Sequence, residues 1–279
     1  MKKLKTILLF LGYCVPIAIG MAIPLAAKPQ SDSAFQFIKT IKGDFTYFNV
    51  DNLDNIYLLT KTNQLKKLKE NGDSIAVFND VKKYGNPDYI DVTNPLKTLL
   101  YYKNYSTVVV LDRLLAPRNS INLRKQNIFY VNNVTLSYDN YIWIFDEEDF
   151  RLKKIDEEGK IVQSSTDWRM LFDTVPAPVK IIDRDNYVYL YDPVKGFYIF
   201  DYYGGFKNRL AFLNWTNVEV NGSNVYGFDN NKLFSYRLKS LQLKEYILPQ
   251  FFGKFISIKA MNGKVYLLNE KGVDIYEIK

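Results

Sequence analysis

Short apolar stretches recur along this chain at an interval of roughly 40 residues, separated by turns rich in Asp, Asn and Gly. Each stretch follows a turn and places a large aliphatic or aromatic side chain at a fixed point. Alternating short runs of this kind predict one β-strand in each of six copies of a repeat. The six stretches are Asn55-Ile56-Tyr57, Thr98-Leu99-Leu100, Tyr141-Ile142-Trp143, Tyr187-Val188-Tyr189, Asn224-Val225-Tyr226 and Lys264-Val265-Tyr266.

A second apolar marker follows the first in every copy, so two independent patterns agree on the number of repeats. This marker predicts the next strand of each copy, and its spacing keeps step with that of the first. The second set comprises Leu65 to Leu68, Val108 to Leu111, Leu152 to Ile155, Phe197 to Phe200, Leu233 to Tyr236 and Val273 to Tyr276.

Within one copy the pattern predicts four short antiparallel strands. In the first copy these strands are Tyr47 to Val50, Ile56 to Thr60, Leu65 to Leu68 and Ile75 to Phe78. The Asp, Asn and Gly residues between them tolerate the positive φ that tight hairpins require. A unit of about 40 residues with four strands is typical of a propeller blade. The sequence therefore predicts an all-β fold, a single six-bladed β-propeller of four-stranded antiparallel blades over residues 35–279.

The last copy supplies only three strands, predicted at Phe255 to Lys259, Val265 to Asn269 and Val273 to Ile278. A candidate for the fourth strand lies at the other end of the domain, in Phe35 to Ile41. Pairing the N-terminal and C-terminal segments in one blade would close the ring and leave no long unpaired edge. We therefore expect Phe37 to lie near Tyr276.

Two stretches carry a resemblance to a known group of proteins. Phe48 to Phe78 and Val134 to Val162 both show an apolar strand ending in Asp, a strand with an apolar-aromatic pair, a third strand and a Gly turn. This arrangement resembles NHL-type repeats and other six-bladed propellers of exported bacterial proteins, especially those of the Bacteroidota. The resemblance covers nearly all of residues 35–279 and is one of scaffold. It implies, as a setting, the specialised protein-secretion machinery of that group.

The N-terminal segment has the layout of an export signal. Met1 to Lys5 is positively charged and is followed by an apolar run from Ile7 to Ala27. Small residues favour cleavage near Ala22 or Ala27, so residues 1–27 are interpreted as a signal peptide and 28–34 as a flexible lead. Because the run is long enough to cross a bilayer, an uncleaved anchor is the alternative. Lipidation at Cys14 is not expected, because the apolar run continues beyond it.

Charge and composition exclude several kinds of site and partner. The chain contains no His and a single Cys, which lies in the predicted signal, so disulfides and Cys or His metal ligands are not expected. Removing Lys2, Lys3 and Lys5 lowers the net charge from +7 to +4. This mild and dispersed charge does not favour nucleic acid as a partner.

Carboxylates are the remaining candidates for a metal site, because some six-bladed propellers hold a divalent cation in the central channel through oxygen ligands. The alternative is that an Asp at a strand end caps its own turn. We expect turn capping, no metal and no cofactor. The candidate channel oxygens are Asp51, Asp91, Asp139, Asp183 and Asp185, and a second set that closes the third strand of three blades is Asp112, Asp156 and Asp201.

Other charged clusters give no catalytic pattern. The runs Asp146 to Asp149 and Asp156 to Glu158 are interpreted as solvated hairpin turns. Basic residues suggest either contacts with acidic lipid or sugar groups or, as we expect, charge that keeps sheet edges soluble. No nucleophile elbow or phosphate-binding loop is present, so the chain is not expected to be an enzyme. These basic residues are Arg118, Arg124, Lys125, Arg151, Lys153 and Lys154.

Aromatic residues make up 16 % of the sequence, and most are expected to pack between blades. Several apolar residues instead lie on predicted connections between copies. Such residues favour a contact surface for another protein, and the alternative is packing of each connection onto the blade edge. The interface candidates are Trp168, Met170, Phe172, Trp215, Phe251 and Phe252.

These observations favour a non-catalytic binding protein of the periplasm or the periplasmic face of the outer membrane. The leading hypothesis is an accessory, scaffold or pore-covering subunit of an outer-membrane export or assembly complex, held at the membrane by its partner or by an uncleaved N-terminal segment. One alternative is a carbohydrate site or a calcium-dependent lactonase-like hydrolase in the central channel. Another is a purely structural envelope protein.

Overall fold

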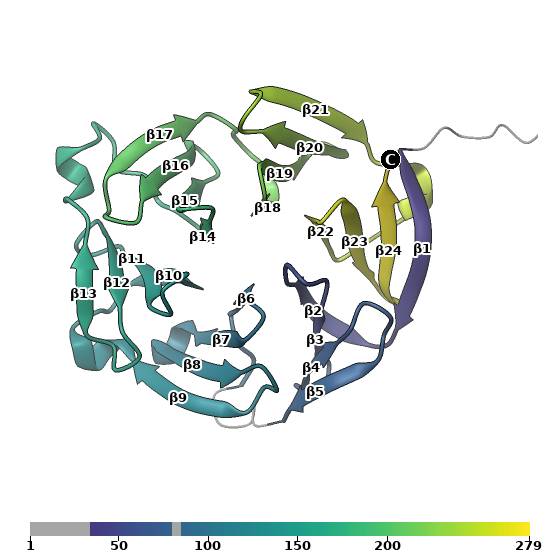
Figure 1. The fold of residues 1–279 in the computed structure, drawn as a ribbon, viewed down its shortest axis with the longest axis horizontal. Helices are drawn as coiled ribbons and strands as arrows, with labels where there is room; N and C mark the ends of the chain where they lie inside the picture. Colours follow the sequence, from purple (N-terminus) through teal and green to yellow (C-terminus); the bar gives the residue numbers. More distant parts are fainter. Residues whose placement is uncertain (1–33, 80–84) are drawn as a thin grey trace, which may run out of the picture. The chain divides into compact units, whose positions relative to one another are not determined.

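The computed structural model describes residues 34–79 and 85–279, which form six four-stranded antiparallel sheets arranged as a ring (Figure 1). Each sheet is a blade, and its four strands follow one another from the central channel to the rim (Figure 1). The predicted all-β class, the six blades and the four strands per blade are confirmed.

We number the blades from the first one that is continuous in sequence. Blade 1 has strands β2 (Phe45–Val50), β3 (Ile56–Thr60), β4 (Leu65–Leu68) and β5 (Ser74–Phe78). Blade 2 has β6 (Tyr89–Asn94), β7 (Lys97–Tyr102), β8 (Thr107–Asp112) and β9 (Pro117–Asn122). Blade 3 has β10 (Val131–Leu136), β11 (Ile142–Asp146), β12 (Arg151–Ile155) and β13 (Ile161–Ser164).

Blades 4 to 6 repeat the arrangement. Blade 4 has β14 (Lys180–Arg184), β15 (Tyr187–Asp192), β16 (Gly196–Asp201) and β17 (Phe206–Leu210). Blade 5 has β18 (Thr216–Asn221), β19 (Asn224–Asp229), β20 (Lys232–Arg237) and β21 (Gln242–Ile247). Blade 6 has β22 (Ser257–Met261), β23 (Lys264–Asn269) and β24 (Gly272–Ile278), and its outermost strand is β1 (Phe35–Lys42). Short 3-10 helices lie at Lys103–Tyr105, Leu123–Gln126, Trp168–Met170 and Gln250–Phe252.

The ring is closed by its two ends, as predicted. Strand β1 pairs with β24 in antiparallel register, and Phe37 lies opposite Tyr276. Their rings meet edge to face, with centroids 5.4 Å apart. The last blade therefore has its full set of strands, and β24 has no free edge.

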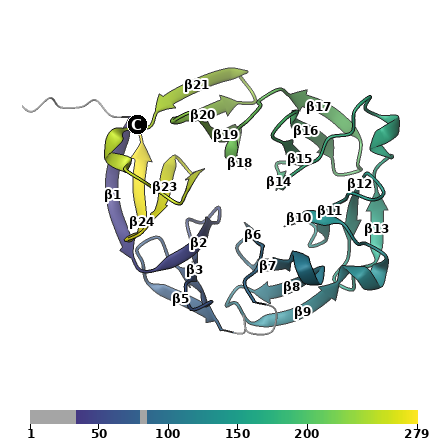
Figure 2. The ribbon, with the colours of Figure 1, turned by 180° about the vertical axis from the view of Figure 1, so that it is seen from behind.

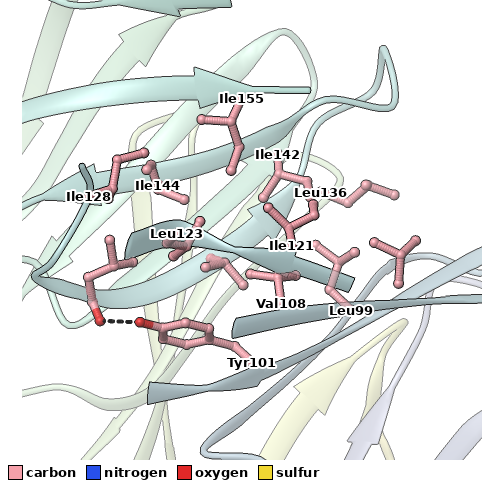
Figure 3. Close-up of a cluster of buried hydrophobic side chains, with 13 residues drawn as sticks. Leu99, Tyr101, Val108, Ile121, Leu123, Ile128, Leu136, Ile142, Ile144 and Ile155 are labelled. Carbon is pink, nitrogen blue, oxygen red and sulfur yellow. Dashed lines mark hydrogen bonds between the residues drawn. The ribbon is translucent and has the colours of Figure 1, made fainter. Parts of the chain in front are cut away.

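The core consists of six separate wedges, each packed between two neighbouring blades. Figure 3 shows the wedge between blades 2 and 3, where Leu99 and Val108 face Leu136 and Ile142. The hydroxyl of Tyr101 in this wedge donates a 2.8 Å hydrogen bond to a backbone carbonyl of β10. The aliphatic and aromatic residues of the two sequence markers fill these wedges, because large side chains are needed to span the gap between twisted sheets.

Strand direction assigns every loop to one of two faces, which Figures 1 and 2 view from opposite sides. Because the strands are antiparallel, the links from one blade to the next emerge on the same face as the turns between second and third strands. We call this the connection face. The turns between first and second strands and between third and fourth strands lie on the opposite side, which we call the turn face.

Two predictions concern residues outside this description. The signal peptide over 1–27 and all but the last residue of the lead over 28–34 lie outside the described residues. Among the residues that are described, none belongs to a helix with the length and apolar character needed to cross a bilayer.

Candidate functional site

A continuous belt of side-chain hydrogen bonds links all six innermost strands around the central channel. Three of its hydrogen bonds join blades 6, 1, 2 and 3. Lys259 Nζ donates to Asn49 Oδ1 at 2.7 Å, and Asn49 Nδ2 donates to the carbonyl of Ile90 at 2.9 Å. The carboxylate of Asp91 then accepts from the backbone N–H of Leu136 at 2.9 Å.

Three further hydrogen bonds continue the belt through blades 4 and 5 and back to blade 6. The backbone N–H of Ile181 donates to Asn133 Oδ1 at 3.2 Å. Lys180 Nζ donates to Glu219 Oε2 at 3.2 Å, and Lys259 Nζ donates to the same oxygen at 2.5 Å. The belt therefore crosses every blade boundary with a polar contact, in addition to the apolar wedge behind it.

Around Glu219 the belt places two lysine ammonium groups against one carboxylate. Burial alone would raise the pKa of the Glu219 carboxyl, but Lys180 and Lys259 outweigh it and hold this pKa at about 2. Burial lowers the pKa of the Lys259 ammonium group, Lys180 and Arg184 lower it further, and Glu219 opposes them. Two lysines thus depend on one carboxylate.

A hollow of about 160 Å³ opens above the belt at the centre of the connection face. Tyr47, Tyr89, Asn217 and Ser257 line it, and Lys180, Glu219 and Lys259 form part of its wall. Because these charged groups already bond to one another, the polar groups that the hollow offers to a ligand are mainly those of tyrosine, amide and hydroxyl side chains.

The candidate metal carboxylates are held apart, and several of them cap their own turns. Across residues 34–79 and 85–279, no three carboxylates gather closely enough to hold a metal ion. Asp51 caps its own turn, accepting from the backbone N–H groups of Leu53 and Asn55 at 2.9 and 3.0 Å. Asp112, Asp156 and Asp201 do the same at the ends of their strands, as predicted for a repeated feature.

Asp91 and Asp183 depart from the turn-capping prediction. Both lie within innermost strands, and both reach across a blade boundary. Asp183 accepts from Trp143 Nε1 at 3.0 Å and from the Tyr202 hydroxyl at 2.7 Å. The turn-capping prediction is therefore wrong for these two residues, whose carboxylates connect neighbouring blades. Asp139 pairs with Lys154 at 2.7 Å, and Asp185 lies in a turn with positive φ.

The interpretation of the acidic and basic clusters also needs correction. Asp146 and Lys153 are almost fully buried and form an ion pair at 2.7 Å, so this part of the run is not a solvated turn. Lys154 is buried as well, on the opposite side of strand β12. Neither lysine is available to an acidic lipid or sugar, nor does either keep a sheet edge soluble. Arg118 remains at the surface, paired with Asp112 at 2.8 Å.

The six interface candidates divide into two groups. Trp168, Trp215 and Phe252 are buried, and Phe172 is partly buried against Trp168. Trp168 lies flat on Phe200, with ring centroids 4.9 Å apart and planes 4° from parallel. These four side chains anchor their connections to the blades, which is the alternative that the sequence left open. They offer a partner little or no surface.

Met170 and Phe251 remain exposed, with 80 % and 53 % of their surfaces accessible. They belong to a wider set, because four links between blades each carry at least one large apolar side chain in contact with solvent. All four links lie on the connection face. The exposed residues are Phe129 and Tyr130 in link 123–130, Met170, Leu171 and Val179 in link 165–179, Leu213 in link 211–215, and Phe251, Phe255 and Ile256 in link 248–256.

The sequence matches no family model, and no curated protein matches it either. Solved structures do share its fold. A virginiamycin B lyase from Staphylococcus aureus is 13 % identical with a TM-score of 0.54, over 83 % of this chain and 80 % of that one. A protein of unknown function from Bacteroides thetaiotaomicron is 12 % identical with a TM-score of 0.57, over 87 % and 73 %.

PorZ of Porphyromonas gingivalis, a bacterial surface component of the type-IX secretion system, is a third similar structure. It is 11 % identical with a TM-score of 0.52, and the match covers 88 % of this chain but only 38 % of PorZ. At such identities the likeness is one of fold alone. The chain is a six-bladed β-propeller, as its repeats and its resemblance to bacterial propellers predicted.

Proposed function

We propose that this chain is a non-catalytic docking protein of the cell envelope, which binds a protein partner through its connection face. The observation that carries the proposal is the exposure of large apolar side chains on four separate links of that face. Exposed apolar groups on loops that a rigid scaffold positions are typical of contact surfaces. Met170 and Phe251 are the sequence-predicted residues that belong to this surface.

The construction of the propeller favours this use. Three of the four links are anchored by a buried aromatic residue, as Trp168 anchors the segment that carries Met170, and link 123–130 is anchored by Leu123 and Ile128. The belt around the channel fixes the blades against one another. A surface that is already ordered loses little conformational entropy on binding, which leaves more of the contact energy for affinity.

The setting that we propose is the periplasm or the periplasmic face of the outer membrane, within an export or assembly complex. The export signal predicted over 1–27 supports this setting, and membrane association would come from the partner or from an uncleaved N-terminal segment. PorZ illustrates that a chain containing this fold can serve a secretion system.

Site-specific photocrosslinking in intact cells tests the proposal. A photoreactive phenylalanine is introduced at Met170 or Phe251 on the connection face, and at Leu53 or Leu241 on the turn face as matched exposed controls. We expect a discrete crosslinked envelope protein from the first pair only. Equal crosslinking from both faces, or a protein that is recovered alone and monomeric from gently solubilised envelopes, would contradict the proposal.

The hollow at the centre of the connection face favours a second candidate function. Its tyrosine, amide and hydroxyl groups fit a small polar ligand such as a carbohydrate. The calcium-dependent hydrolytic alternative has less support, because the described residues bring no three carboxylates together. A ligand that binds only the folded protein raises the melting temperature. Thermal melts with divalent cations and small glycans test this alternative, and the absence of any shift counts against it.

A further inference from the structure

A tyrosine-rich notch lies on the turn face between blades 3 and 4, away from the channel and the connection face. It encloses about 580 Å³, which is within the range of small-molecule sites. Tyr138 comes from the first turn of blade 3, while Tyr187, Tyr202 and Tyr203 come from blade 4. Tyr138 and Tyr203 are exposed over 66 % and 88 % of their surfaces, so the notch presents aromatic surface directly to solvent.

The aromatic floor of the notch is held in place from below. The rings of Tyr138 and Tyr202 stack with centroids 4.4 Å apart and planes 15° from parallel. Lys154 Nζ lies 5.6 and 5.5 Å from the centres of these two rings and 4.4 Å from that of Trp143. A buried lysine among aromatic faces fixes their spacing through cation–π attraction. The platform is therefore preformed.

The polar rim of the notch is electrically balanced. Asp139 pairs with Lys154 at 2.7 Å, and Asp201 pairs with Lys207 at 2.8 Å. Gln163 also lines the notch, and its side-chain amide donates to the carbonyl of Tyr202 at 2.6 Å. Carboxylate and amide oxygens each carry more than one acceptor site, so groups that are already paired can still bind a hydroxyl. A charged ligand would instead compete with one of the two ion pairs.

We propose that this notch is a binding site for a neutral saccharide chain. A sugar ring presents an apolar face of C–H groups, which packs on an exposed tyrosine ring, and a rim of hydroxyls, which hydrogen-bond to carboxylate and amide oxygens. The notch supplies both kinds of group side by side, with no net charge among its two ion pairs. The site lies on the face opposite the docking surface, so it adds a second ligand to the proposed function.

Binding of linear neutral tetrasaccharides to the purified full-length protein tests this inference. Cellotetraose, maltotetraose, mannotetraose and chitotetraose are titrated by calorimetry, with tetragalacturonate as the charged comparison. We expect at least one neutral sugar to bind with a dissociation constant of about 1 mM or tighter. Tyr203→Ala and Tyr138→Ala should each weaken that binding by about tenfold or more.

Tyr130→Ala is the matched control, because Tyr130 is a tyrosine of similar exposure, 62 %, on the connection face. It should leave sugar binding unchanged, and unaltered melting temperatures show that all three variants fold. No binding of any neutral sugar, preference for tetragalacturonate, or equal affinity in the wild type and both notch variants would overturn the inference. Because the two surfaces lie on opposite faces, sugar binding can fail while connection-face crosslinking persists, and the reverse.

Discussion

Asp183 and Trp143 join two neighbouring blades through a buried hydrogen bond, in which the Trp143 indole N–H donates to a carboxylate oxygen at 3.0 Å. The second carboxylate oxygen accepts from the Tyr202 hydroxyl at 2.7 Å. Burial nevertheless dominates and raises the pKa of Asp183 from 3.8 to about 6, although these bonds and the nearby Lys154 oppose it. The folded protein therefore holds a proton on Asp183 over a pH range in which the unfolded chain has lost it.

This raised pKa predicts a pH dependence of stability. Between the ordinary and the folded value, the folded state binds more protons than the unfolded state, so the contribution of Asp183 to the free energy of unfolding increases as the pH falls. From pH 7 to pH 5 the gain is on the order of 1 kcal/mol. Urea unfolding at the two pH values, compared between wild type and Asp183→Asn, isolates this contribution. A difference between the two proteins that stays constant with pH would contradict it.

Glu219 is the single counter-charge for two lysines of the channel belt, and its removal should be costly. In Glu219→Gln, Lys180 and Lys259 lose the carboxylate that both of them contact. Leaving buried ammonium groups without an anion should lower the free energy of unfolding by about 3 kcal/mol or more.

Lys259→Met is the matched comparison for that experiment, because it leaves Glu219 paired with Lys180. We expect less than half the loss in this variant. Urea unfolding measures both changes, and equal losses would show that the two lysines do not share the carboxylate in the way the geometry implies.

Gly272 allows the closing strand to approach, because a Cβ at this position would lie 2.0 Å from the carbonyl oxygen of Ile41 in β1. Gly272→Ala should therefore displace β1 and lower the free energy of unfolding by about 3 kcal/mol. Gly263→Ala is the control, since Gly263 also has a positive φ but has open space around it, and should cost about 1 kcal/mol. Similar losses in the two variants would mean that β1 does not pack as described.

Trp168 and Met170 lie two residues apart on one link and should respond to mutation in opposite ways. Trp168→Ala removes a fully buried ring from the wedge between blades 3 and 4 and should destabilise the protein by about 3–5 kcal/mol. Met170→Ala should change stability by less than about 0.5 kcal/mol, yet weaken crosslinking or co-purification of the partner. If the Met170→Ala protein loses partner binding and also has a lowered melting temperature, the loss of binding is explained by unfolding, and this side chain has no separate docking role.

Much of the fold could be predicted because each repeat carries the pattern of its own four strands and turns. Strands β3 and β4 have the predicted bounds, and the other strands of the first blade differ by no more than a few residues. The closing strand was predictable because one blade lacked a strand and Phe35 to Ile41 could supply it. These inferences depend on patterns within one blade, where hydrophobic alternation and turn residues are sufficient.

Side chains whose environment comes from another blade were not predictable in the same way. The sequence presents Lys154 and Asp183 as ordinary surface or turn residues. In the structure, Tyr202 of blade 4 lies against Lys154 of blade 3, and Trp143 of blade 3 donates a hydrogen bond to Asp183 of blade 4. Burial of a charge depends on that three-dimensional partner, which no single repeat contains.

The tyrosine notch escaped sequence analysis for the same reason. Tyr138 and Tyr203 lie in turns of different blades, and one turn tyrosine alone has no specific meaning. Aromatic residues in the first turn of one repeat and in the last turn of the next repeat were the available signal. Comparing turns across copies, rather than strands within a copy, would have found it.

The use of β1 as the outer strand of the last blade has a consequence for the order of events during synthesis. The segment Phe35–Lys42 is synthesised before the five blades that are continuous in sequence, and its pairing partner, Gly272–Ile278, is synthesised after them. Five blades can assemble before β1 is paired. Final closure then joins β1 to β24, the most widely separated pair of neighbouring strands in the ring, and contacts between distant segments are the slowest to form. Until then β24 is paired on one edge only, with β23, so the ring carries an open seam that a chaperone or a second copy could occupy.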